Sequence, residues 1–178
     1  YGLDRYLRAP GDMCKIISGS EGTLAGVFSA ELRIVPLPPD VIGLGLFFFD
    51  SIAEAMQATV EFADLKPAAI EHVDRVLFDQ TRGQLAFQAT RDLLQLDEEP
   101  CEAFLIVEFQ HDVEDSIAEA AKRGIGKRSM ILTNPAKMDI VWNMRKAGLS
   151  LLTGRKGPAK PIAGIEDVAV EPKRLPEY

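Results

Sequence analysis

The chain has 178 residues, of which 47% are hydrophobic, 26% charged and 7% aromatic. This composition is that of a globular protein of one or two domains, and it excludes the disordered, collagen-like and disulfide-rich classes. Lysine and arginine total 20 and aspartate and glutamate total 27, which gives a net charge of −7. The acidic balance argues against nucleic-acid binding and favours a small-molecule or protein partner.

Targeting and redox signals are few. The two cysteines, Cys14 and Cys101, have neither disulfide-framework nor metal-site spacing, so we expect a reduced, cytoplasmic protein, at most peripheral to the inner membrane. The most apolar run, residues 41–49, is shorter than the roughly 20 residues of a spanning helix, so we expect no membrane span. The sequence does not begin with methionine, and we interpret it as part of a longer protein.

A proline cluster at residues 36–39 divides the chain. Neither a helix nor a central strand crosses such a cluster, so we expect one domain over residues 1–40 and a second over residues 41–178. Before the cluster, residues 27–35 begin with an apolar pair and then alternate. This pattern predicts a strand with one buried face.

Two units of similar design follow the cluster. In the first, an apolar strand over residues 41–49 precedes a helix capped by Ser51, and a second strand covers residues 68–73. In the second, a strand over residues 103–109 precedes a helix capped by Ser116. A strand over residues 129–133 completes that unit.

The two predicted helices carry the same six residues, Asp-Ser-Ile-Ala-Glu-Ala, at 50–55 and 115–120. Either an old duplication or convergence of alanine-rich capped helices explains this repeat. Two β-α-β units predict an α+β fold: a ferredoxin-like sandwich with a largely antiparallel sheet and helices on one face.

The remaining segments are read from local signals. The pattern of residues 74–100 predicts a polar helical segment, which ends in a solvated acidic turn at residues 97–100. Asn134 and Pro135 are a cap and a first helical residue, and they predict a helix to about Leu149. A short strand is expected over residues 168–170.

Residues 17–27 contain three glycines and several hydroxyl groups between apolar stretches. Glycines let a backbone approach a ligand, and free N–H and hydroxyl groups bind phosphate or carbonyl oxygens. The spacing matches no standard nucleotide motif, so a plain turn between strands is the alternative.

Arg145 shares one stripe of the last predicted helix with Met138, Trp142 and Leu149. This position predicts a partly buried guanidinium, which needs an anion. A substrate carboxylate is one solution. An ion pair within the chain, with Glu166 or Asp167 as partner, is the other.

Four segments, in this order, resemble FAD-linked oxidases and dehydrogenases of the vanillyl-alcohol-oxidase type, in the D-lactate dehydrogenase and glycolate oxidase branch. The segments are residues 19–24 (GSEGTL), 67–74 (PAAIEHVD), 142–147 (WNMRKA) and 165–170 (IEDVAV). The first is similar to the last FAD-contacting segment of that branch, and the others to its C-terminal cap domain. The resemblance therefore implies that residues 1–40 are the C-terminal end of an FAD-binding domain and that residues 41–178 are an incomplete substrate cap domain. Residues 1–7 and 13–15 are similar to large members with an appended iron–sulfur domain.

The resemblance implies a chemistry. A 2-hydroxy acid such as D-lactate, glycolate or D-2-hydroxyglutarate gives a hydride to FAD, and the electrons leave to a quinone, an iron–sulfur module or an electron-transfer flavoprotein. It implies that Arg145 binds the substrate carboxylate, and it assigns no catalytic residue or metal ligand to this chain. It also implies FAD contacts at Gly19, Ser20, Gly22, Thr23, Gly26 and Val27.

The family's pyrophosphate-binding segment and its histidine-bearing segment are not in the sequence. We therefore expect the 178-residue chain by itself neither to retain FAD nor to turn over substrate. The alternative hypothesis is a free-standing ferredoxin-like module that binds a small ligand or dimerises, with a purely structural glycine turn.

Overall fold

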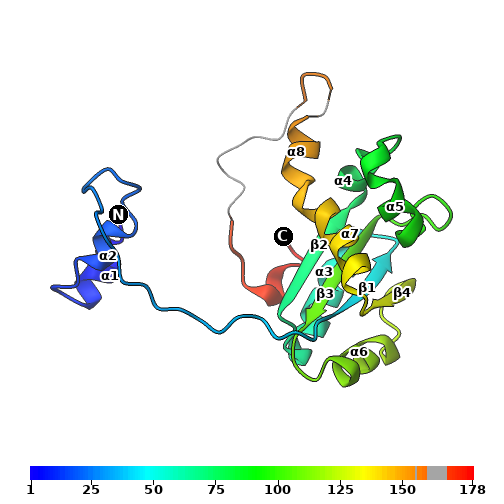
Figure 1. Cartoon of the computed structure of the whole chain (residues 1–178), viewed down its shortest axis with the longest axis horizontal. Helices are drawn as coiled ribbons and strands as arrows, with labels where there is room; N and C mark the ends of the chain where they lie inside the picture. The colour runs from blue at the N-terminus through cyan, green and yellow to red at the C-terminus, as the bar shows by residue number, and fades with distance from the viewer. Residues whose placement is uncertain (155, 160–167) are drawn as a thin grey trace. The chain divides into compact units, whose positions relative to one another are not determined.

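The computed structural model describes residues 1–154, 156–159 and 168–178. They form two compact units, Tyr1–Leu37 and Pro38–Tyr178 (Figure 1). The first unit contains two short helices, α1 (Leu3–Arg8) and α2 (Cys14–Ile17). The second unit contains the sheet and the other helices, and each unit is described by itself below.

The strand predicted over residues 27–35 is absent. The segment has no regular secondary structure, and it makes no backbone hydrogen bond to the described part of the chain. Its apolar side chains are exposed, as Phe28 and Leu32 illustrate. An alternating pattern becomes a strand only where a neighbouring strand pairs with its backbone and a core covers its apolar face, and the described residues supply neither.

The second unit is built on a four-stranded antiparallel sheet in the order β2-β3-β1-β4. Strand β1 (Gly43–Phe49) pairs with β3 (Ala103–Phe109) and with β4 (Arg128–Leu132), and β2 (Ala69–Asp74) forms the other edge. Helix α3 (Ile52–Phe62) connects β1 to β2, and α6 (Val113–Lys122) connects β3 to β4. This is the predicted ferredoxin-like α+β arrangement, and it is confirmed.

Helices cover both faces of the sheet. The face that carries Phe47 and Phe49 packs against the two crossover helices α3 and α6, as predicted, and is called the α3 face. The face that carries Leu46 and Phe48, called the α7 face, packs against α4 (Arg75–Asp79), α5 (Leu85–Leu94) and α7 (Pro135–Lys146). The prediction of helices on one face omitted this second layer. Because all seven residues of β1 are buried, the strand requires cover on both sides.

Two of the three predicted helix caps are confirmed. The Ser51 side chain accepts a hydrogen bond from the backbone N–H of Glu54 at 3.2 Å, and Asn134 accepts one from Lys137 at 3.2 Å with Pro135 in the first turn. Ser116 is no cap, because α6 begins one turn earlier, at Val113.

The early start of α6 follows from burial. Val113 and Ile117, one turn apart, both pack on the α3 face, so the extra turn adds apolar contact. The shared six-residue sequence therefore begins α3 but lies inside α6. The repeat consequently marks no structurally equivalent pair of helix starts.

The structure divides the last predicted helix into two helices. Helix α7 ends at Lys146 and α8 covers Gly148–Thr153, where one helix to Leu149 was expected. At Gly148 an added Cβ would lie 2.8 Å from Cδ1 of Leu77 in α4, so the new helix packs too closely there for a larger residue. Leu149, which was expected to share the apolar stripe of Arg145, is 71% exposed.

The C-terminal strand is also absent. Val168, Ala169 and Val170 have no regular structure, and a short 3-10 helix, η2 (Pro172–Arg174), follows. The rest of the fourth family-like segment, residues 165–167, lies outside the described residues. Within the described ranges, none of the helices has the length and apolar character needed to cross a membrane.

Candidate functional site

The glycine-rich loop of the first unit is a chain of short-range turns. Ser20 is 2% exposed and its hydroxyl donates to the Ile17 carbonyl at 2.8 Å, and the Thr23 hydroxyl donates to the Ser20 carbonyl at 2.7 Å. Both hydroxyl hydrogens therefore hold the loop together. The Thr23 Oγ1 atom also lies 3.0 Å from the hydroxyl of Tyr1, so this oxygen is already engaged within the unit.

The backbone of this loop is open on its outer side. Gly22 has a φ of +76°, the left-handed region that favours glycine, and an added Cβ there would meet no atom within 4 Å. Gly26 is equally open, and Gly19 has a single neighbour, at 3.6 Å. Val27 is exposed. An open glycine backbone fits the close approach of a cofactor such as FAD, and the contacts with FAD stay a prediction.

Arg145 lies in the last turn of α7 and is partly buried, with 40% of its side chain exposed. Met138 of the same stripe is buried in the core of the α7 face, and Trp142 packs against it. The prediction of a partly buried guanidinium is confirmed. Its role as a carboxylate ligand stays a prediction.

The anion beside Arg145 is Glu71 of β2. The Arg145 Nε group donates to Glu71 Oε2 at 2.6 Å, and the pair joins residues 74 positions apart. Of the partners expected from the sequence, Glu166 and Asp167 lie outside the described residues. The contact therefore connects two of the four family-like segments, residues 67–74 and residues 142–147.

Glu71 was missed as a partner, although the strand carried a signal. Ala69, Glu71 and Val73 alternate along β2, so they share the α7 face, where Glu71 lies opposite Ile106 of β3. A carboxylate between two apolar residues on a core-facing side requires a partner. Sequence spacing alone does not say which helix supplies it.

The other polar residues of this strand have separate tasks. Asp74 caps α4, because its side chain accepts a hydrogen bond from Leu77 N–H at 2.9 Å. His72 is on the α3 face, and its Nε2 atom is buried without a hydrogen-bond partner among the described residues. Burial lowers the pKa of His72, and the charge of Asp74 opposes that shift.

The acidic segment at residues 97–100, expected to be a solvated turn, contains a structural anchor. Arg91 is 2% exposed, and its Nε donates to Asp97 Oδ2 at 3.0 Å. Its Nη1 donates to the carbonyl of Phe78 and to the hydroxyl of Thr81. The hydrogen bond from Arg91 holds the pKa of Asp97 below its ordinary value, with Arg82 adding to the effect.

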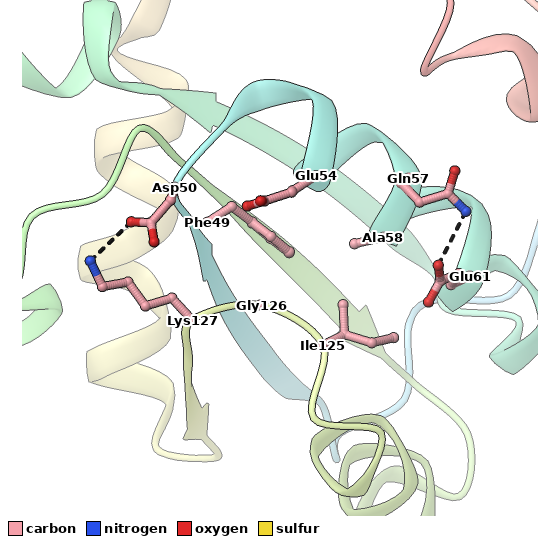
Figure 2. Close-up of a pocket in the computed structure, with 9 residues that line it drawn as sticks. All are labelled: Phe49, Asp50, Glu54, Gln57, Ala58, Glu61, Ile125, Gly126 and Lys127. Carbon is pink, nitrogen blue, oxygen red and sulfur yellow. Dashed lines mark hydrogen bonds and ion pairs between the residues drawn. The ribbon is translucent and has the colours of Figure 1, made fainter.

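A groove of about 490 Å³ lies between α3 and the loop before β4 (Figure 2). Its floor is Phe49, Ala58 and Ile125, and three carboxylates line it. Asp50 pairs with Lys127 at 2.9 Å, and Gln57 donates to Glu61 at 3.1 Å. The groove is on the α3 side of the sheet, away from Arg145, and its acidic lining disfavours an anionic substrate.

Metal chemistry has no support in the described ranges. They contain no group of three or more histidine, cysteine, aspartate or glutamate side chains arranged to hold a metal ion. Cys101 is buried, and burial raises the pKa of its thiol. Cys101 therefore has the properties of an unreactive core residue.

Residues 38–178 match the family described as FAD linked oxidases, C-terminal domain. The chain belongs to this family. Proteins named D-2-hydroxyglutarate dehydrogenase from Pantoea ananatis and Escherichia coli are each 28% identical to it, over 183 and 181 residues. One of the same name from Haemophilus influenzae is 25% identical over 183 residues. Each alignment covers 94% of this chain but only 18% of the relative, so the chain spans less than a fifth of the length of these proteins.

Proposed function

We propose that the chain is the substrate-covering part of an FAD-dependent enzyme that oxidises a 2-hydroxy acid. The observation that carries the proposal is Arg145, a partly buried guanidinium on the α7 face of a sheet module that belongs to a flavin-linked oxidase family. The family membership favours this hypothesis over a free-standing ligand-binding or dimerisation module.

Arg145 is the residue to which we assign the substrate carboxylate. Its guanidinium is held at the end of α7, and 40% of the side chain is exposed, so a ligand can reach it. A planar guanidinium matches a carboxylate through two parallel hydrogen bonds, which orient the ligand as well as bind it. Binding of this kind fixes the direction in which the hydroxyl-bearing carbon of a 2-hydroxy acid is presented.

The glycine-rich loop is the segment to which we assign FAD contact, through Gly19, Ser20, Gly22, Thr23, Gly26 and Val27. The open glycine backbone supports this assignment. FAD, when bound, supplies the two-electron acceptor that the oxidation of an alcohol to a ketone requires.

The test is a substrate panel on the natural full-length protein loaded with FAD. An artificial dye serves as electron acceptor, so that the result does not depend on the physiological one. We expect dye reduction with a D-2-hydroxy acid, and D-2-hydroxyglutarate is tried first because three relatives carry that name. D-lactate, glycolate and L-2-hydroxyglutarate complete the panel. A flavin-loaded protein that reduces the dye with none of them contradicts the proposal.

A further inference from the structure

We propose that Glu71 is a positioning residue, which holds the Arg145 guanidinium so that its two outer nitrogens face the substrate carboxylate. This inference rests on the proposed function, because it assumes that Arg145 binds that carboxylate. It adds a residue on the opposite element, β2, to a site otherwise placed on α7. The observation behind it is the 2.6 Å contact between Arg145 Nε and Glu71 Oε2.

The contact uses only one side of the guanidinium. Among the described residues, Nη1 and Nη2 of Arg145 have no hydrogen-bond partner, whereas Nε is bound. A guanidinium offers a carboxylate either the Nε side or the pair of outer nitrogens. With Glu71 on Nε, the outer pair remains available for a second carboxylate.

Comparison with the other arginines of the second unit shows that this arrangement is unusual. Five described arginines there have side chains less than half exposed. Four of them, Arg75, Arg91, Arg123 and Arg128, use at least one outer nitrogen on a partner within the protein. Of these five described arginines, Arg145 alone is bound through Nε only.

The scaffold around the pair fixes its direction. Glu71 is anchored in the paired strand β2 opposite Ile106, and Met144 beside Arg145 is fully buried in the core of the α7 face. Both ends of the contact therefore belong to packed elements. Both side chains still reach solvent, since 34% of Glu71 and 40% of Arg145 are exposed, so a ligand can approach.

The negative charge of Glu71 gives the proposal a distinctive signature. Glu71 orients Arg145 but also competes electrostatically with an incoming substrate carboxylate. Glu71→Gln keeps an oxygen that accepts from Nε and removes the charge, so we expect it to retain most of kcat and to lower KM. Glu71→Ala removes both the accepting oxygen and the charge, so the Arg145 guanidinium is no longer held in one orientation.

The experiment measures kcat and KM of the natural full-length, FAD-loaded enzyme with its best 2-hydroxy acid. We expect Glu71→Ala to lower kcat/KM by about 10–100-fold, the size typical of a misplaced binding group, and Glu71→Gln to restore most of kcat. The matched control is Asp64→Ala, which breaks the 2.8 Å pair with Arg123 next to the opposite α3 face. The control is expected to leave kcat and KM unchanged.

A purely structural ion pair would behave differently. It predicts lower stability in both Glu71 variants and unchanged kcat and KM for the folded, flavin-loaded fraction. That result, alongside a loss of activity in Arg145→Ala, overturns the role of Glu71 and leaves the proposed function intact.

Two further outcomes are decisive. We expect Glu71→Ala to have no additional effect in an Arg145→Ala background, because Glu71 acts through Arg145. Additive losses would overturn the inference. An enzyme that oxidises no 2-hydroxy acid overturns the proposed function and this inference with it.

Discussion

At the scale of single residues, three ion pairs serve different purposes. Arg91 and Asp97 tie a helix to the loop that follows it, and the arginine is nearly inaccessible. Arg123 and Asp64 join two elements in a more exposed place, where an ion pair contributes little to stability. Arg145 is the most exposed of the three arginines, with 40% of its side chain exposed against 23% for Arg123, and its pair with Glu71 leaves part of the guanidinium open. Exposure and the number of nitrogens already engaged separate structural arginines from one available to a ligand.

The Arg91–Asp97 pair gives a prediction about stability. Asp97→Ala leaves a buried guanidinium without its carboxylate. Such a loss typically lowers the free energy of unfolding by about 3–5 kcal/mol when both partners are buried. We expect about 2 kcal/mol here, because Asp97 is 41% exposed and Arg91 keeps its bonds to Phe78 and Thr81. The measurement is urea unfolding at pH 7, with Glu98→Ala as the control in the same acidic segment.

The same pair predicts a pH dependence. The pKa of Asp97 is lowered in the folded protein, so its contribution to stability is fully present above the unfolded-state value of about 4 and is lost as the pH falls through the folded-state value. The difference between wild type and Asp97→Ala should therefore shrink below about pH 4. A difference that is unchanged between pH 7 and pH 3 contradicts this assignment.

At the scale of elements, the two copies of Asp-Ser-Ile-Ala-Glu-Ala show how context decides the meaning of a local signal. Ser51 begins α3 and bonds to Glu54 N–H. Ser116 lies inside α6, and its hydroxyl is 3.4 Å from the His111 carbonyl, a long and weak contact. The capping signal was correct only at Ser51, where strand β1 continues to Phe49 and leaves no room for an earlier helical turn.

This difference predicts unequal effects of the same substitution. Ser51→Ala removes a cap and should lower the free energy of unfolding by about 1 kcal/mol. Ser116→Ala removes no cap and places a better helix former in the helix, so a change of at most a few tenths of a kcal/mol, roughly, is expected. Thermal or urea unfolding of both variants measures the contrast. Equal losses in the two variants would show that Ser116 also caps a helix.

Much of the sheet was predictable from the sequence. Apolar runs such as residues 103–109 and the caps at Ser51 and Asn134 are local signals, and the structure confirms the elements that they predict. The second helix layer was not predicted as such, because no local pattern tells which face an amphipathic helix covers. The strand expected over residues 27–35 needs a partner strand, which is a property of the surroundings and not of the segment.

The candidate site was predictable only in part. The helical stripe placed Arg145 in a partly buried position, as the structure confirms. Its partner Glu71 is 74 residues away, so only the folding of β2 against α7 brings them together. The glycine-rich loop was visible in the sequence, and its contacts with FAD stay a prediction.

At the scale of the whole molecule, the chain consists of two compact units with different character. Residues 38–178 form a sheet covered on both sides, and they match the FAD-linked oxidase family. Residues 1–37 form a small unit that ends in a segment without regular secondary structure and with exposed apolar side chains. The net charge of −7 belongs to these 178 residues, less than a fifth of the length of the relatives. It therefore says little about the partners of a complete enzyme.

The central claim is that Arg145 binds the carboxylate of a 2-hydroxy acid, and steady-state kinetics of Arg145 variants test it most directly. In the natural full-length, FAD-loaded protein, Arg145→Ala should lower kcat/KM by about 100-fold, because two charge-assisted hydrogen bonds are lost. The kcat/KM of Arg145→Lys should lie between those of the wild type and Arg145→Ala, since lysine keeps the charge but not the planar guanidinium. The control is Arg123→Ala, whose side chain pairs with Asp64 elsewhere. Wild-type kcat and KM in Arg145→Ala would contradict the account.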